Sequence, residues 1–251
     1  MANVASIREE DRLSLATDGT LQATGNATTA ASVEWGISMI KAPDVWATGN
    51  TGQGIVVGGI DTGVRATHEV LRGKFRSSFG GSLNFEPALK AWIAAGIIPV
   101  FSAGNAGPGC STLDSPGDNS NAIGVGATDI NDGLGRLSSK GPTKDGRVKP
   151  DLSAPGIAIR SSASQATQPT GTSHAAPHVA GVVALMLSAN KNLSFAQVRD
   201  ILTSTTDRAP TIKPSGMTCG GTADSTYPNN QYGYGRLNAL NAVAKAKSMA
   251  L

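Results

Sequence analysis

One segment constrains the fold of this chain more than any other. Residues 172–189 read TSHAAPHVAGVVALMLSA, a run rich in Ala, Val and Gly. Because such a run is apolar on most faces of a helix, we expect a helix over Thr172–Ala189 that lies in the core. Small side chains pack by close approach of backbones, in agreement with the 31 glycines and the low aromatic content of 4%.

Short apolar runs alternate with helical patterns along the rest of the chain. The runs that predict buried strands cover residues 54–60, 97–101 and 122–127. The patterns that predict helices lie near residues 43–46 and over residues 86–96, 194–203 and 237–248. This alternation predicts an α/β fold in which helices cover both faces of a mostly parallel sheet.

The charge of the chain is small and evenly spread. Its 21 basic and 18 acidic residues give a net charge of +3 without any run of Lys or Arg, so we expect no nucleic-acid binding. No apolar stretch approaches the length of a membrane-spanning helix, so we expect no membrane insertion. The N-terminus carries Arg8, Glu9, Glu10 and Asp11, which is not the pattern of a signal peptide.

The chain has two cysteines, Cys110 and Cys219, which are far apart in the sequence. A zinc site would need more ligands at tighter spacing. Two interpretations remain open, namely one disulfide in a secreted domain and two unrelated thiols.

Polar residues that could carry chemistry follow two of the predicted strands. Asp61 comes directly after residues 54–60, and a turn that contains Asn105 follows residues 97–101. In parallel sheets functional residues collect at the carboxyl ends of strands, so both residues could belong to one site. Asp61 could also cap a turn, and Asn105 could belong to an ordinary turn rich in Gly and Asn.

A third cluster, residues 171–181, reads GTSHAAPHVAG and places Ser173 at the start of the predicted core helix. The free amides and the dipole of a helix N-terminus favour a developing oxyanion, and small neighbours allow a substrate carbonyl to come close. A serine in this position could instead be a simple N-cap. The specific run of eleven residues favours a nucleophile.

The three clusters, in this order, resemble the motifs of subtilisin-like serine proteases, the subtilase family. The resemblance runs from about Trp35 to the C-terminus and implies a three-layer subtilisin-like α/β fold with a mostly parallel central sheet. It also implies a serine endopeptidase that forms an acyl-enzyme on Ser173. Asp61 then matches the carboxylate that orients the general base, and Asn105 matches the side-chain amide of the oxyanion hole.

The resemblance extends to substrate binding and to the tail of the chain. Ser78, Phe79 and Gly80 resemble the strand that lines the cleft, to which a peptide or protein substrate would add by β-augmentation. Residues 228–239 are similar to the closing segment of bacillopeptidase F-like members of the family.

The resemblance divides the chain into two parts. Residues 4–13 look like the last strand of a subtilase propeptide and residues 22–32 like a linker, so we expect a propeptide remnant and linker over residues 1–34 and a peptidase domain over residues 35–251. The family implies a secreted monomer with no required cofactor. Structural calcium is a property of the family, but no Asp-rich loop indicates its ligands here, so we assign no metal site.

One motif of the family is missing. A serine becomes an effective nucleophile when a neighbouring imidazole accepts its proton, and subtilases supply that imidazole from a His-Gly-Thr-His helix between the Asp and Asn motifs. No such sequence occurs between Asp61 and Asn105, and the resemblance breaks near residues 76–77. An alternative interpretation is therefore a catalytically inactive, truncated subtilase or pseudo-protease that at most binds peptides.

The three histidines of the chain do not replace the missing one in an obvious way. His68 matches a family histidine that is not the base. His174 directly follows Ser173, so its side chain leaves the helix about 100° away from that of the serine. His178 leaves about 140° away and matches a structural histidine of the same motif.

Overall fold

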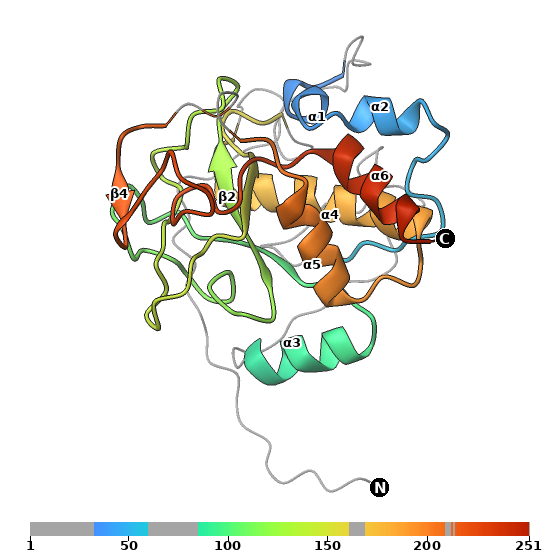
Figure 1. Cartoon of the computed structure of the whole chain (residues 1–251), viewed down its shortest axis with the longest axis horizontal. Helices are drawn as coiled ribbons and strands as arrows, with labels where there is room; N and C mark the ends of the chain where they lie inside the picture. The colour runs from blue at the N-terminus through green and yellow to red at the C-terminus, as the bar shows by residue number, and fades with distance from the viewer. Residues whose placement is uncertain (1–32, 60–84, 161–168, 209–211, 213, 251) are drawn as a thin grey trace, which may run out of the picture.

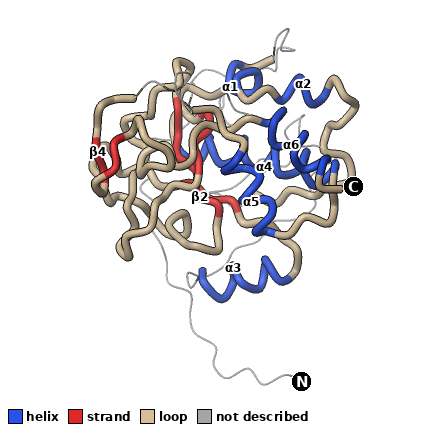
Figure 2. Tube along the Cα trace, viewed as in Figure 1, coloured by secondary structure: helices blue, strands red, loops and turns tan. Residues whose placement is uncertain are grey.

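The computed structural model describes residues 33–59, 85–160, 169–208, 212 and 214–250. The elements of this part are, in chain order, α1 (Trp35–Met39), α2 (Ala42–Trp46), α3 (Phe85–Ala94), β1 (Val100–Ser102), β2 (Ile123–Thr128), β3 (Leu152–Pro155), α4 (Thr172–Ala189), α5 (Phe195–Ser204), β4 (Thr218–Cys219), β5 (Thr222–Ala223) and α6 (Ala239–Ser248). Figure 1 shows α4 in the middle of the molecule with α5 and α6 beside it, and Figure 2 shows that loops form much of the side where β4 lies.

Three parallel strands form the sheet beneath α4. β2 lies in the middle and pairs with β1, where Val100 is opposite Ile123, and with β3, where Val125 is opposite Leu152. Every residue of β2 and β3 is buried, which is typical of parallel strands that are covered on both faces. The predicted α/β class with a parallel sheet is confirmed.

Helices cover the two faces of this sheet. On one face α4 packs against all three strands, and Val100 of β1 packs against this core. Phe101 is next along β1 and faces the other way, because successive side chains of a strand alternate. On that side its ring lies 6.3 Å from those of Phe85 and Trp92 in α3. α3, the sheet and α4 therefore form three layers.

The small side chains of α4 allow the close packing that the composition predicts. α4 spans the predicted range, and its buried residues Ala175, Val179, Val182 and Met186 repeat at the three- and four-residue spacing of one helix face. α6 packs on the same helix with the side chains of Ala239, Ala242, Val243 and Ala246.

Side-chain caps set where two of the helices begin. α5 starts with a capping box, in which Ser194 Oγ accepts from the Gln197 N–H at 3.3 Å and Gln197 Oε1 accepts from the Ser194 N–H at 2.9 Å. α6 starts at Ala239, two residues later than predicted. The reason is that Asn238 Oδ1 caps the helix by accepting from the Asn241 N–H at 3.0 Å.

The buried strand predicted over residues 54–60 is wrong for residues 54–59, which form no strand. Val56 is 69% and Val57 is 58% exposed. A strand is buried only when neighbouring strands and helices cover it, and in the part of the chain that the structure describes β1 pairs with β2 alone. Apart from the half-buried Ile55, residues 54–59 therefore remain exposed despite their apolar sequence.

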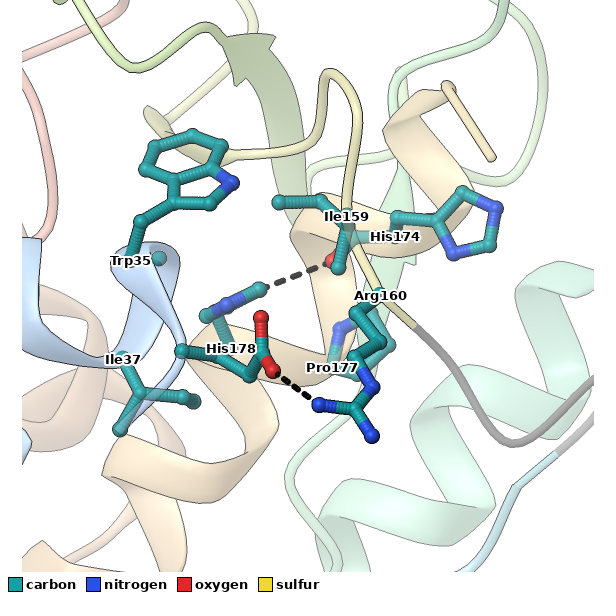
Figure 3. Close-up of a pocket in the computed structure, with 9 residues that line it drawn as sticks. Trp35, Ile37, Ile159, Arg160, His174, Pro177 and His178 are labelled. Carbon is teal, nitrogen blue, oxygen red and sulfur yellow. Dashed lines mark hydrogen bonds and ion pairs between the residues drawn. The ribbon is translucent and has the colours of Figure 1, made fainter. Parts of the chain in front are cut away.

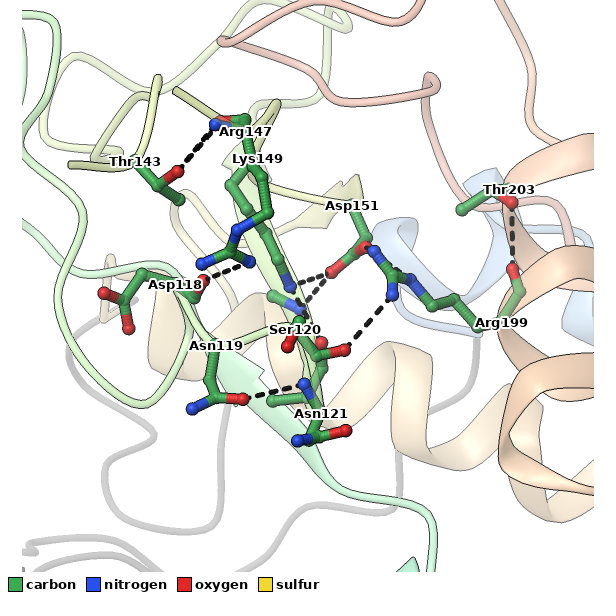
Figure 4. Close-up of polar contacts among 12 residues, drawn as sticks. Asp118, Asn119, Ser120, Asn121, Thr143, Arg147, Lys149, Asp151, Arg199 and Thr203 are labelled. Carbon is green, nitrogen blue, oxygen red and sulfur yellow. Dashed lines mark hydrogen bonds and ion pairs between the residues drawn. The ribbon is translucent and has the colours of Figure 1, made fainter. Parts of the chain in front are cut away.

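A buried charge cluster connects β2, β3 and α5 (Figure 4). Asp151 lies directly before β3, and its Oδ2 accepts from the Gly124 N–H at 2.7 Å and from Lys149 Nζ. Its Oδ1 accepts from Arg199 Nε of α5 at 2.8 Å, and the Lys149 ammonium also donates to the Ala122 carbonyl at 2.8 Å. The side chains of Lys149 and Asp151 are both 1% exposed. These contacts fix where β3 begins.

Candidate active site

Ser173 lies in the first turn of α4 and is exposed. The position of this turn is set by the residues that follow β3, because the Gly171 N–H donates to the Gly156 carbonyl at 2.8 Å. Gly156 has to be a glycine, since a Cβ there would approach the Ala127 Cβ to 2.6 Å and the Gly171 oxygen to 2.8 Å. The helix start is therefore held tightly against the end of the sheet.

Asn105 contacts the start of α4 from the loop that follows β1. It follows β1 by three residues, and its Oδ1 accepts from both the backbone N–H and the Oγ1 hydroxyl of Thr172, each at 2.9 Å. Thr172 Oγ1 also lies 3.1 Å from the Gly104 carbonyl. Only an oxygen can accept from the Thr172 N–H, so the Asn105 oxygen faces the helix and its Nδ2 amide is available as a donor.

Two hydrogen-bond donors thus lie at the start of α4. One is Asn105 Nδ2, and the other is the backbone N–H of Ser173, which has no intrahelical acceptor because it lies in the first turn. The positive end of the α4 dipole adds to both. This arrangement can stabilise negative charge that develops on a carbonyl oxygen next to Ser173.

Thr172 is a site residue that the sequence analysis missed. It is fully buried and is the residue that attaches Asn105 to α4. Its position directly before Ser173 was the available signal, but nothing in the sequence shows which residue its hydroxyl and amide contact.

The contacts of His178 lie on the α1 side of α4. His178 is buried, its Nδ1 lies 2.9 Å from the His174 carbonyl, and its Nε2 faces Gly36 of α1. Burial lowers the pKa of His178, an effect that the backbone contact opposes in part. Figure 3 shows the rings of His174 and His178 pointing in different directions.

The pocket in Figure 3 lies on the α1 side of α4. It is lined by residues of α1, α4 and the segment between β3 and α4, which are Glu34, Trp35, Gly36, Ile37, Ile159, Arg160, His174, Pro177 and His178. Arg160 and Glu34 form an ion pair of 2.9 Å beside it. His174, Pro177 and His178 place the pocket beside the first two turns of α4, starting at the residue that follows Ser173.

The loop that carries Asn105 is held in place on two sides. Its backbone bonds to residues 137–141, for example through the Gly107 N–H and the Leu137 carbonyl at 2.8 Å. A disulfide joins Cys110 to Cys219 of β4 with a Cα–Cα distance of 5.5 Å. Asn105 is therefore fixed by its own loop as well as by Thr172.

The other predicted site residues lie outside the described part of the chain. They are Asp61, Ser78, Phe79 and Gly80, and His68 lies there as well. Their roles stay predictions.

Within the described ranges no group of three or more His, Cys, Asp or Glu side chains is arranged to hold a metal ion. None of the described helices combines the length and apolar character that crossing a bilayer requires.

Comparisons with known proteins match the part of the chain that contains Asn105 and Ser173. The model of the Subtilase family matches residues 75–235. Bacillopeptidase F of Bacillus subtilis (strain 168) is 39% identical over 184 residues, which are 67% of this chain and 12% of that protein. Serine protease AprX of the same strain is 36% identical over 177 residues, which are 61% of this chain and 36% of that protein.

Subtilisin DY of Bacillus licheniformis is 32% identical over 191 residues, which cover 74% of this chain and 67% of that protein. The chain spans only a part of the length of Bacillopeptidase F and of AprX. The family match nevertheless includes both the Asn105 loop and the first turns of α4. The chain belongs to the subtilase family of serine proteases.

Proposed function

We propose that the chain is a subtilisin-type serine endopeptidase that hydrolyses peptide bonds through an acyl-enzyme on Ser173. The observation that carries the proposal is the attachment of Asn105 Oδ1 to Thr172, because it holds the Asn105 side chain at the start of α4, on the residue directly before the exposed Ser173. If Ser173 only capped α4, there would be no reason for the loop after β1 to place the Asn105 amide at the start of this helix.

The reaction follows from this placement. Ser173 Oγ attacks the carbonyl carbon of the substrate while a base accepts the hydroxyl proton, and the carbonyl oxygen becomes an oxyanion. Asn105 Nδ2 and the Ser173 N–H stabilise that charge. The amine then leaves with a proton, and water hydrolyses the acyl ester to restore the serine. Asp61 is proposed as the carboxylate that orients the base.

A peptide or protein is the proposed substrate, bound in extended form along Ser78, Phe79 and Gly80. The chemistry needs no cofactor. The disulfide between Cys110 and Cys219 supports a further proposal, namely that the chain is secreted, because disulfides persist in oxidising compartments.

A second candidate function is peptide binding without catalysis. It is favoured by the lack of a His-Gly-Thr-His sequence and by the contacts of His178, which turn its ring toward α1 and away from the nucleophile. Loss of the base removes most of the rate, since removal of the triad histidine of subtilisin, a member of the same family, lowers kcat about 10⁶-fold.

A fluorophosphonate probe separates the two candidates, because it reacts only with an activated serine. In a serine endopeptidase the probe labels Ser173, and labelling disappears in Ser173→Ala but persists in Ser188→Ala, a matched change on the same helix whose hydroxyl contacts Gln53 instead. Asn105→Asp keeps an acceptor for Thr172 but removes the amide donor, so we expect labelling to slow by about 100-fold or more. Folded wild-type protein that is not labelled but binds peptides would establish the second candidate.

A further inference from the structure

The carboxylate of Asp114 lies beside the loop that carries Asn105. The Asp114 N–H donates to the Ala103 carbonyl at 3.0 Å, which brings the Asp114 side chain over Gly104. A Cβ on Gly104 would lie 2.6 Å from Asp114 Oδ2 and 2.8 Å from Ser139 Oγ. Gly104 has a φ of 107°, a conformation that favours glycine. Position 104 therefore has no side chain that would displace the Asp114 carboxylate.

The fold of the described residues does not use the Asp114 carboxylate. Asp114 is exposed, and within the described ranges no Lys, Arg or His forms an ion pair with it and no donor forms a hydrogen bond with its side-chain oxygens. Other acidic residues close to the sheet differ in this respect. Asp151 pairs with Lys149 and Arg199, and Asp207 pairs with Arg236. Asp114 therefore presents a negative charge to solvent next to the proposed oxyanion hole.

The distance from Asp114 to Asn105 suits a long cationic side chain. Gly104 directly precedes Asn105, so the Asp114 carboxylate lies within about 8 Å of the Asn105 Cα, given about 3.8 Å between consecutive Cα atoms. A substrate carbonyl that faces Asn105 Nδ2 brings the side chain of its own residue next to this loop. Lys and Arg carry their charge at the end of three or four methylene groups and so can span such a gap.

We propose that Asp114 selects substrates by binding the Lys or Arg side chain of the residue whose carbonyl Ser173 attacks. The inference rests on the proposed function, because it assumes that a peptide carbonyl docks between Asn105 and Ser173. Asp114 is a specificity-determining residue in this proposal and takes no part in the chemical steps.

Peptide binding tests the proposal without requiring catalysis. Acetyl-Ala-Ala-Ala-Arg amide is titrated into the whole chain by calorimetry and compared with the same peptide ending in citrulline, the neutral analogue of arginine. Because a charged pair at an exposed site is worth a modest amount, we expect the arginine peptide to bind about fivefold to tenfold more tightly at low salt. The preference should shrink as ionic strength rises.

Two variants assign the preference to its residue. Asp114→Asn should bind the arginine and citrulline peptides equally, and it should fold normally because the Asp114 carboxylate makes no hydrogen bond or ion pair in the described part of the chain. Asp200→Asn is the matched control, since Asp200 is an exposed aspartate of α5, and it should retain the preference.

The outcomes are separable from those of the fluorophosphonate experiment. Equal binding of the two peptides by the wild type, a preference that survives in Asp114→Asn, or no binding of either peptide would overturn the role of Asp114. An uncharged fluorophosphonate reports on Ser173 alone, so labelling of Ser173 without an arginine preference would leave the proposed function standing and remove this inference.

Discussion

Replacing Asp151 by asparagine should destabilise the fold far more than removing the lysine that it pairs with. Both oxygens of Asp151 are in use, one by the Gly124 N–H and Lys149, the other by Arg199. An asparagine at this position would have a single acceptor oxygen and an amide that can only donate. The asparagine amide would therefore face either the Gly124 N–H and Lys149 or Arg199, all of which are donors, in a site where the Lys149 side chain is 1% exposed.

The size of the effect follows from which charge is left alone. In Asp151→Asn the Lys149 ammonium keeps only the Ala122 carbonyl as a full partner, and an uncompensated buried charge costs about 3–5 kcal/mol. In Lys149→Met the carboxylate keeps Arg199 and the Gly124 N–H, so we expect a loss of no more than about 2 kcal/mol.

The pH dependence provides a second, independent readout. Burial lowers the pKa of Lys149 and outweighs the attraction of Asp151, so the unfolded state binds the proton more readily than the folded state. Stability that depends on this group therefore increases as pH rises from the folded pKa toward the ordinary lysine value of about 10.4. Without the carboxylate the difference widens, so the deficit of Asp151→Asn should shrink between about pH 7 and pH 9.5.

Urea unfolding followed by tryptophan fluorescence at both pH values measures these free energies. Asp145→Asn serves as the control, because Asp145 pairs with Arg147 at 2.7 Å on the surface and its loss should leave the midpoint unchanged. Equal losses for Asp151→Asn and Lys149→Met, or an Asp151→Asn deficit that grows with pH, would refute this account of the cluster.

Three further changes probe other parts of the fold. Cys110→Ser with Cys219→Ser opens a connection between residues 109 positions apart, and chain entropy predicts a loss of about 4–5 kcal/mol in urea unfolding. Burial raises the pKa of Tyr232 to about 12 from 10.0, so the unfolded state loses its proton first and stability should fall between pH 10 and 12; Tyr232→Phe should flatten that fall in a thermal-unfolding series. Gly124→Ala would place a methyl group against the Gly117 carbonyl oxygen and should lower the urea midpoint by the equivalent of about 1–3 kcal/mol.

The helices of the core could be predicted because their signals are local. The composition of residues 172–189 determines that α4 is a buried helix, and Ser194 followed by Gln197 marks the start of α5. The strand predicted at residues 54–60 had an equally apolar sequence, yet Val56 and Val57 are exposed. Whether an apolar run is buried depends on the segments that pair with it, and no property of the run itself contains that information.

The candidate site could be predicted in part. The motifs point to Ser173 and Asn105 as candidates, and the contact between Asn105 and Thr172 agrees with the rule that sites form at the carboxyl ends of parallel strands. The connecting role of Thr172 was not predictable, because it depends on hydrogen bonds between residues 67 positions apart. The burial of Lys149 and Asp151 was also hidden, since charged side chains are seldom fully buried unless they are paired.

β3 could not be predicted from the sequence, yet it helps to position the start of α4, which could. The strand has only four residues and ends in Pro155, so it has little strand signal of its own. Asp151 fixes its first end through Lys149 and Arg199, and beyond its other end the Gly156 carbonyl holds the Gly171 N–H at the start of α4. The position of the proposed nucleophile Ser173 therefore depends on the buried charge cluster of Lys149, Asp151 and Arg199 at the opposite end of β3. The serine motif can be recognised in the sequence, whereas the charge cluster that helps to position it cannot.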